Sequence, residues 1–325
     1  MRGWIIVLMV HTFLIFQGCR RALPVTVSVT EFALGTTVDI TVVAIDSTSA
    51  YNGIRRAAAE LHRIGFDFWE GEPNGALGRL NSERRTANRE LIALIDRALA
   101  FGRMTAGAFD IRVGQIIESY GFITKESYAA VDDDRLDRLV HASRLLAFAG
   151  SDSVRFLTGS DATLTLGGIA KGYAVDRVVD ILMDAGCQAG VVNAGGDLKV
   201  WGGTAEKPWY IGIEDPQTGG ILQRLMLLEG ALATSGDYRN RFYGDSALIH
   251  HIVDPGSGRS ANPSHSTSVY APDCTTADAL ATAFFVLGEE AAREIAEQMD
   301  RIGVFQLRPD FTSWHNRYMD GVIPE

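Results

Sequence analysis

The spacing of apolar residues predicts mainly helices in the first half of the chain. Alternating β-branched residues over 25–45, interrupted at Leu34-Gly35, predict a β-hairpin. Apolar residues recur with helical spacing in four further segments, 49–68, 89–104, 113–120 and 132–141. A loop rich in Gly, Pro and Asn is expected over 71–78. Short apolar runs then predict strands at 143–149, 153–158 and 162–166.

The second half is patterned mainly as short strands. After a helix expected over 173–185, glycine turns separate strands at 189–193, 197–201, 208–214, 223–228, 230–234, 249–253 and 266–271. Helices over 276–287 and 289–301 and a strand over 303–308 complete the pattern. Helices and strands are thus grouped rather than alternating, and no break in composition divides the chain. The sequence predicts one large α+β domain with a helix-rich first half and a strand-rich second half.

The N-terminus has the layout of a secretory signal. Arg2 is followed by an apolar run over 4–16 that is too short for a stable membrane span. Cys19 directly follows Gly18, as in a bacterial lipobox, although Phe16 stands where leucine is usual. We therefore expect a lipoprotein signal peptide over 1–18, a tether over 19–27 that starts at a lipidated Cys19, and a domain over 28–325. The protein is then an exported lipoprotein on the periplasmic face of the cell membrane; an ordinary cleaved signal or an uncleaved anchor is the alternative.

Composition and charge restrict the ligands. With 325 residues, 46% of them hydrophobic, the chain can form a sizeable core. Its net charge of −10 argues against nucleic acid or an anionic surface as the main partner. An anionic ligand therefore requires a local positive site or a bound cation. Cys187 and Cys274 lack the spacing of a metal site, and we expect them to be small buried side chains, with a disulfide as the alternative.

The segment 166–173, LGGIAKGY, connects a predicted strand to a predicted helix. Its glycines allow the backbone to approach a ligand closely, and the free N–H groups of a helix start favour a phosphate. It is not a Walker A loop, because Lys171 precedes Gly172 and Tyr173 replaces the metal-binding hydroxyl. A plain turn with Lys171 on the surface explains the pattern as well.

Two further segments place polar side chains beside glycine turns or strands. NAGGD at 193–197 predicts a hairpin turn with an aspartate after two glycines. In SGDYRNR at 235–241, Arg239 and Arg241 can hold a phosphate or face the solvent. His250 and His251 begin an apolar strand, so only one of them can reach a given cleft. That histidine is a candidate general base, and a structural histidine is the alternative.

The helix that starts near residue 274 presents two hard oxygen ligands on one face. Asp278 and Thr282 are four residues apart, a spacing that suits Mg²⁺, which binds through few protein ligands. The alternative is helix capping, with Thr275 as the N-cap and Asp278 near the capping-box position. The spacing alone favours this capping role.

Seven motifs occur in the order seen in the ApbE family, which the chain resembles from about residue 28 to residue 308. They read LGTTVDI, GAFDIRVG, LGGIAKGYAVD, NAGGD, SGDY, HIVDP and ADALATA. ApbE proteins are FAD:protein FMN transferases, many of them exported lipoproteins. The resemblance implies a single large ApbE-like, T-fold-related α+β domain.

The resemblance also implies a set of site residues. Asp278, Thr282 and the backbone carbonyl of Ala170 are implied to hold Mg²⁺, and His251, in the pattern H-x-x-D-P, to be the catalytic base. The implied flavin contacts are Leu34, Ala108, Phe109, Asp110, Gly167, Tyr173 and Ile252, with Gly195, Gly196 and Asp197 as neighbours. Trp69 is the candidate for aromatic stacking, because the segment over 75–81 departs from the family pattern at Gly75.

The implied reaction splits FAD at its pyrophosphate. AMP leaves, and FMN is joined through its phosphate to a threonine hydroxyl of a target protein. Implied targets are subunits of membrane redox complexes, such as the Na⁺-pumping NADH:quinone reductase and the Rnf complex, or other exported flavinylated proteins. Two alternatives stay open: an FAD pyrophosphatase that releases FMN and AMP, and a non-catalytic FAD-binding lipoprotein. Asp278, Thr282 and His251 argue against the latter, since binding alone requires neither metal nor base.

Overall fold

An eight-stranded antiparallel sheet forms the centre of the molecule, with strand order β1-β2-β6-β7-β10-β13-β14-β15. The computed structural model describes residues 23–123, 128–149, 153–157, 162–244 and 248–324, so the predicted signal peptide and Cys19 lie outside the described residues. The strands of the sheet are β1 (Val25–Ala33), β2 (Thr36–Ala44), β6 (Cys187–Ala194), β7 (Asp197–Trp201), β10 (Gly230–Gly236), β13 (Ser266–Ala271), β14 (Gly303–Leu307) and β15 (Ser313–His315).

The N-terminal hairpin confirms the alternating pattern. Val38, Ile40 and Val42 of β2 are fully buried, and their sequence neighbours face the other side of the sheet. β1 pairs with β2 from Val25, opposite Ala44, to the turn at Leu34-Gly35. The domain therefore includes 25–27, which the sequence analysis assigned to the tether.

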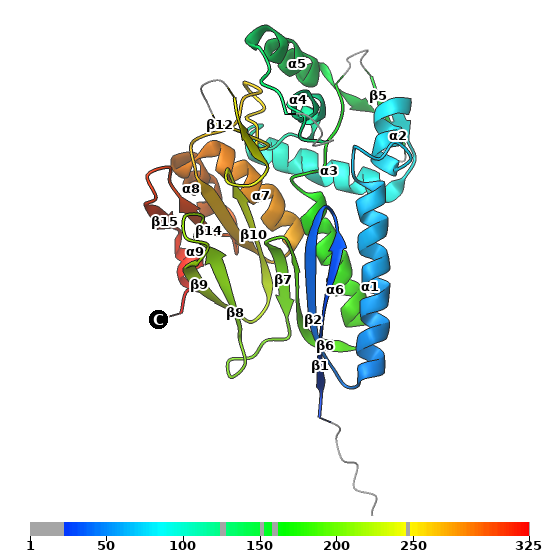
Figure 1. Cartoon of the computed structure of the whole chain (residues 1–325), viewed down its shortest axis with the longest axis vertical. Helices are drawn as coiled ribbons and strands as arrows, with labels where there is room; N and C mark the ends of the chain where they lie inside the picture. Colours follow the sequence, from blue (N-terminus) through cyan, green and yellow to red (C-terminus); the bar gives the residue numbers. More distant parts are fainter. Residues whose placement is uncertain (1–22, 124–127, 150–152, 158–161, 245–247, 325) are drawn as a thin grey trace, which may run out of the picture.

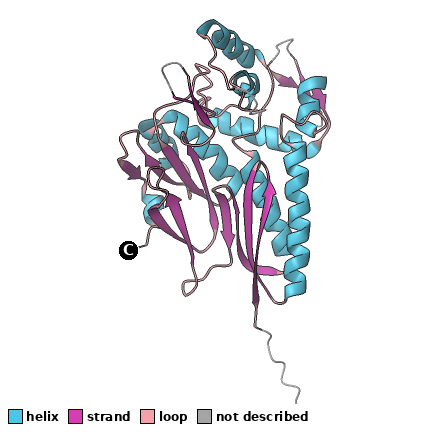
Figure 2. Cartoon of the chain, viewed as in Figure 1, coloured by secondary structure: helices cyan, strands magenta, loops and turns pink. Residues whose placement is uncertain are grey.

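Three helices lie side by side on one face of this sheet (Figures 1 and 2). They are α1 (Ser47–Asp67), α6 (Ala170–Asp184) and α7 (Cys274–Leu287). α1 buries Ile54, Leu61 and Ile64, which form its apolar stripe. α7 is buried along almost its whole length between α6 and strands β10 and β13, which makes it the central helix of the core.

Smaller elements cover the rest of the sheet. On the opposite face, the hairpin of β8 (Trp209–Glu214) and β9 (Ile221–Leu227) shares an apolar cluster with β7 and β10. Near the start of α6, a second cluster joins α4 (Gly114–Ser119) and α5 (Asp133–Leu145). The other elements are α2 (Ala76–Glu83), β3 (Arg85–Thr86), α3 (Arg89–Met104), η1 (Ile111–Val113), β4 (Phe148–Ala149), β5 (Val154–Phe156), β11 (Arg241–Tyr243), β12 (Leu248–His250), α8 (Glu289–Glu297) and α9 (Arg317–Asp320).

The predicted α+β class and its division into two halves are confirmed, but some local predictions are wrong. Residues 162–166 form no strand, because their backbone bonds the η1 region instead, with Thr165 N–H donating to Ile111 O at 2.8 Å. The predicted loop over 71–78 gives way to α2 at Ala76, and α5 continues to Leu145, where a strand was expected from 143. Within the described ranges, no helix has the length and apolar character needed to cross a membrane.

Candidate active site

The start of α6 lies against α7, and a glycine makes this approach possible. The backbone N–H of Gly172 donates to Asp278 Oδ2 at 2.9 Å. A Cβ atom at position 172 would lie 2.2 Å from the carbonyl oxygen of Cys274 and 2.8 Å from Asp278 Cβ. Only glycine fits this distance between the helices, so the LGGIAKGY segment and the helix of Asp278 form one structural unit.

The capping role expected for Asp278 is wrong. The N-cap of α7 is Asp273, whose carboxylate accepts from Thr276 N–H at 2.8 Å. Thr275, expected as the N-cap, instead donates its hydroxyl to Asp176 Oδ2 of α6 at 2.6 Å. The carboxylate of Asp278 is therefore free of the helix terminus and is directed at α6. Cys187 and Cys274 are both buried and unpaired, which confirms the small-side-chain interpretation.

Lys171 lies between two buried carboxylates. Its Nζ is 2.6 Å from Asp197 Oδ2 and 3.5 Å from Asp278 Oδ1. Burial raises the pKa of Asp278, and the positive charge of Lys171 opposes that effect. Burial disfavours the charge on Lys171, but the two carboxylates more than offset this and raise its pKa. The simple interpretation of Lys171 as a surface residue beside a plain turn is therefore wrong.

Thr282 lies against another glycine of the same segment. A Cβ on Gly168 would lie 3.1 Å from Thr282 Oγ1, so a larger residue here would crowd this hydroxyl. Ser235 Oγ of β10 lies 3.2 Å from the same hydroxyl. Ala170, the first residue of α6, stands between Gly168 and Gly172. The glycines thus hold the backbone of the segment against both Asp278 and Thr282.

These donors fit Mg²⁺. Carboxylate, hydroxyl and backbone carbonyl are hard oxygen ligands, and Gly168 lies against one of them, the hydroxyl of Thr282. Among the described residues, no group of three or more His, Cys, Asp and Glu side chains could hold a metal. A cation here must therefore complete its coordination with waters or substrate oxygens, as Mg²⁺ does with phosphates.

The two adjacent histidines have different environments. His250 is fully buried, with Nε2 2.9 Å from Ala261 O and Nδ1 accepting from Ile252 N–H at 3.3 Å, which is a structural role. His251 stacks edge-on against Phe122, and no described residue forms a hydrogen bond with its Nδ1. Burial, with smaller contributions from His250 and Lys171, lowers the pKa of His251 to about 3. His251 is thus a neutral imidazole whose buried Nδ1 has no hydrogen-bond partner among the described residues.

The remaining predicted flavin contacts line the surroundings of this segment. Phe109 is buried, and a Cβ on Gly168 would lie 3.1 Å from its ring. Its neighbour Ala108 is also buried, whereas Asp110 caps η1 and pairs with Arg112 at 2.6 Å. The structure therefore brings Phe109 to the site and leaves the Asp110 carboxylate engaged with an arginine.

Two polar networks hold neighbouring backbone. Gly167 N–H donates to Thr165 Oγ1 at 3.2 Å, and the hydroxyl of Thr165 donates to Glu70 at 2.6 Å. The hydroxyl of Tyr173 donates to Glu90 at 2.8 Å. Ile252 is buried directly after the histidine pair. Gly167 and Tyr173, both predicted, are thus fixed at the two ends of the segment.

The outer predicted contacts come from three turns. Leu34 has a left-handed backbone, with φ 55°, at the tip of the β1–β2 hairpin, where its side chain packs beside Gly65 of α1. Trp69 is 47% exposed, and its indole covers Gly71, where a Cβ would lie 2.4 Å from the ring. The turn of Gly195 and Gly196 leads into Asp197, and Arg239 donates to the Gly195 carbonyl.

Comparison with known proteins identifies the family. The family model described as the ApbE family matches residues 34–305. The chain belongs to the ApbE family. It is 30% identical over 318 residues to the FAD:protein FMN transferase of Vibrio cholerae, with 91% of each chain covered. It is 31% identical over 261 residues to the enzyme of the same name from Treponema pallidum, covering 73% of this chain and 72% of that one.

Solved ApbE structures have the same fold. The crystal structure of the ApbE protein from Thermotoga maritima matches with a TM-score of 0.84 and 29% identity, over 92% of this chain and all of that one. The flavin transferase ApbE of Vibrio cholerae matches with a TM-score of 0.78 and 25% identity, with the same coverage. The single-domain prediction is therefore confirmed by independent structures.

Sequence reasoning missed several residues of this ApbE site. Lys171 was seen only as a defect in a Walker pattern, and Ser235 only as part of a motif. Glu70 and Glu90 gave no signal, since a lone acidic residue in or beside a helix is usually solvated. The contacts of these residues form only when the fold brings distant segments together. Glu70 and Thr165, for example, are 95 positions apart in the sequence.

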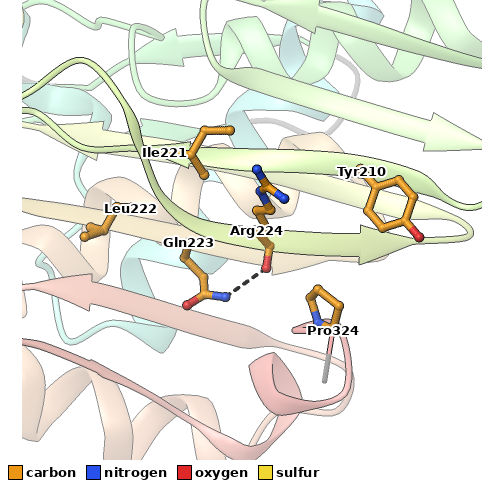
Figure 3. A pocket seen from close by; sticks show the side chains of 6 residues that line it. All are labelled: Tyr210, Ile221, Leu222, Gln223, Arg224 and Pro324. Atoms are coloured by element: carbon orange, nitrogen blue, oxygen red, sulfur yellow. Dashed lines mark hydrogen bonds between the residues drawn. The ribbon is translucent and has the colours of Figure 1, made fainter.

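A surface pocket of about 540 Å³ lies elsewhere on this ApbE protein, on the β8–β9 hairpin (Figure 3). It is lined by Tyr210, Ile221, Leu222, Gln223, Arg224 and Pro324. None of them is a predicted site residue, and Tyr210 and Ile221 are mostly exposed. The pocket lacks paired acidic or histidine side chains, so we place the chemistry at the α6–α7 contact instead.

Proposed function

We propose that the protein is an FAD:protein FMN transferase that uses Mg²⁺ to split FAD, releases AMP and joins FMN to a threonine hydroxyl of a target protein. The observation that carries the proposal is the contact between α6 and α7, where Gly172 N–H binds Asp278 and Gly168 lies against Thr282. Curated relatives at about 30% identity with this name support the same activity.

The chain's own residues supply the binding and the proton transfer. Asp278, Thr282 and the Ala170 carbonyl would hold Mg²⁺, which when bound would neutralise pyrophosphate charge and stabilise the departing AMP. Gly167 and Gly168 allow the nucleotide to approach the backbone. These residues place the phosphate at the start of α6, where the helix dipole also favours an anion.

His251 takes the proton of the acceptor hydroxyl. As the threonine oxygen attacks the phosphorus on the FMN side, the bridging P–O bond breaks, and AMP leaves with its electron pair. The lowered pKa of about 3 keeps the imidazole neutral at neutral pH, so one of its ring nitrogens can accept a proton. The negative charge of the bound phosphate raises the basicity of His251 at the moment it is needed.

The proposed location is the periplasmic face of the cell membrane, with lipid on Cys19. β1 runs from Val25 to Ala33 and ends at the Leu34 turn beside the site. Nine residues at roughly 3.4 Å each separate the start of the domain from the active-site end by about 30 Å. An anchored enzyme would thus present its site away from the lipid, toward an extramembrane segment of a membrane redox subunit.

Gel fluorescence tests the proposed transfer. The purified protein is incubated with FAD, MgCl₂ and the flavin-free form of the acceptor subunit of a Na⁺-pumping NADH:quinone reductase, and covalent flavin is detected after denaturing electrophoresis. We expect a fluorescent acceptor band that is lost when the acceptor threonine is replaced by alanine. His251→Ala should abolish the band while FAD affinity is kept. Equal labelling by His251→Ala and the parent would refute the role of this histidine.

One observation also favours hydrolysis of FAD as a side reaction. No described residue forms a hydrogen bond with the buried Nδ1 of His251, so a water molecule that takes the place of the acceptor hydroxyl can be activated by the same imidazole. Release of FMN and AMP without an acceptor measures this activity. The non-catalytic alternative explains neither the oxygen ligands at the α6–α7 contact nor a buried histidine without a hydrogen-bond partner on Nδ1. FAD that stays intact with Mg²⁺ and acceptor present would favour it.

A further inference from the structure

Lys171, at the start of α6, lies closer to one of its two carboxylate partners than to the other. Lys171 Nζ is 0.9 Å closer to Asp197 Oδ2, at 2.6 Å, than to Asp278 Oδ1, at 3.5 Å. Both aspartate side chains are 4% exposed, whereas Lys171 is 33% exposed. Buried carboxylates require compensation, so Lys171 is their counter-ion in this arrangement.

The two carboxylates differ in what else holds them. Asp278 is fixed through Oδ2 by Gly172 N–H at 2.9 Å and cannot turn away from α6. Asp197 receives a weaker bond from Thr234 N–H at 3.4 Å. Lysine carries its charge on a flexible four-carbon stem, so the ammonium is the group that can move. A displaced Lys171 would keep its shorter contact, with Asp197, and release Asp278.

We propose that Lys171 is the counter-ion of Asp278 in the FAD-free protein. When a divalent cation binds Asp278, the ammonium of Lys171 moves away from this carboxylate and stays paired with Asp197. This inference rests on the proposed function, since it concerns the same Mg²⁺ site. Asp197 thereby becomes a positioning residue, because it draws the ammonium away from the ligand.

Charge counting gives a consequence for the order of binding. Two carboxylates and one ammonium sum to one negative charge, and Mg²⁺ makes the cluster positive by one. Without FAD, Mg²⁺ must therefore displace the Lys171 ammonium from Asp278, and the bound Mg²⁺ is then repelled by the ammonium beside it. The pyrophosphate of FAD brings two negative charges and removes this penalty, so Mg²⁺ and FAD should each strengthen the binding of the other.

Calorimetric titration of MgCl₂ into the FAD-free protein tests the proposal. Lys171→Met should bind Mg²⁺ at least tenfold more tightly than the parent, because the competing charge is gone. Asp197→Asn should bind it several-fold more weakly, because Lys171 then pairs with Asp278 alone. The matched control is Lys199→Met, which removes a lysine paired with Asp176 of the same helix at 2.8 Å and should change the affinity less than twofold.

Thermal unfolding of the same variants gives a second test, which applies even if a substitution lowers the stability. Lys171→Met leaves two buried carboxylates uncompensated, so its Tm should fall without Mg²⁺ and recover with it, more than in Lys199→Met. Unchanged Mg²⁺ affinity in Lys171→Met, or tighter binding in Asp197→Asn, overturns the proposal. FMN transfer by the parent is measured separately: normal transfer with unchanged affinity rejects only the lysine role, and absent transfer with the expected affinities rejects only the proposed function.

Discussion

Replacing Gly172 with alanine should separate the two halves of the site. The added Cβ would lie 2.2 Å from the carbonyl oxygen of Cys274, against 3.4 Å or more for an ordinary contact. The obstacle is backbone of α7 and cannot rotate away, so the two helices must part by about an ångström. That shift stretches the bond from Gly172 N–H to the Asp278 carboxylate.

The magnitude follows from two costs. Overpacking in a tight core costs about 1–3 kcal/mol, and weakening a hydrogen bond to a charged group costs about 1.5–3 kcal/mol. Both costs arise from the same movement of α6 away from α7, so they are not fully additive. We expect the free energy of unfolding to fall by about 3–5 kcal/mol in total. With an unfolding entropy near 2.1 cal/mol/K per residue, Tm should fall by about 5–8 °C.

Calorimetry and Mg²⁺ titration measure both consequences. The matched control is Gly321→Ala, where the nearest atom to the new Cβ, the Tyr318 carbonyl oxygen, lies at 3.5 Å. Gly321→Ala should keep the parental Tm within about 1 °C. Gly172→Ala should also weaken Mg²⁺ binding at least tenfold. A Gly172→Ala protein with parental Tm and parental Mg²⁺ affinity would refute the reasoning that this glycine sets the contact between the helices.

Three further predictions concern neighbouring positions. Gly168→Ala places a Cβ 3.1 Å from Thr282 Oγ1, so Mg²⁺ affinity in calorimetry should fall at least tenfold, with a stability change below about 1 kcal/mol; an equal affinity contradicts it. His251 has an ordinary pKa of 6.5 that folding lowers to about 3, so between these values the unfolded state binds more protons and stability decreases as the pH is lowered. His251→Gln should therefore lose about 2 kcal/mol less than the parent between pH 8 and pH 5 in urea melts, and equal losses count against the buried neutral imidazole. Thr165→Val removes the acceptor of Gly167 N–H and should weaken FAD binding about tenfold, whereas Thr165→Ser retains it; fluorescence quenching distinguishes the two.

The fold was largely predictable because periodicity reflects burial. The alternation in β2 and the helical spacing in α1 each match one buried face. The errors fell where tertiary contacts override local pattern. Residues 162–166 read as a strand from their apolar run, yet they bond η1, a short segment with no strand pattern of its own.

The site was predictable only through motif order. Spacing placed Asp278 and Thr282 on one face but favoured a cap, because it could not show that Asp273 already fills that position. The adjacent histidines do have different environments, but the strand expected over 249–253 is wrong beyond His250, where β12 ends, so strand alternation does not explain the difference. The pairing of Lys171 with Asp197 could not be derived, because the two residues are 26 positions apart, separated by most of α6, strand β6 and the turn after it.

The central claim is that Mg²⁺ at Asp278 supports FMN transfer initiated by His251. Its most direct test is mass spectrometry of the acceptor subunit after incubation with FAD, with and without MgCl₂, for the parent, Asp278→Asn and His251→Ala. The account predicts one FMN added at the acceptor threonine by the parent with Mg²⁺. It predicts no addition without Mg²⁺ or by His251→Ala, and strongly reduced addition by Asp278→Asn. Parental levels of FMN on the acceptor from Asp278→Asn and His251→Ala would contradict it.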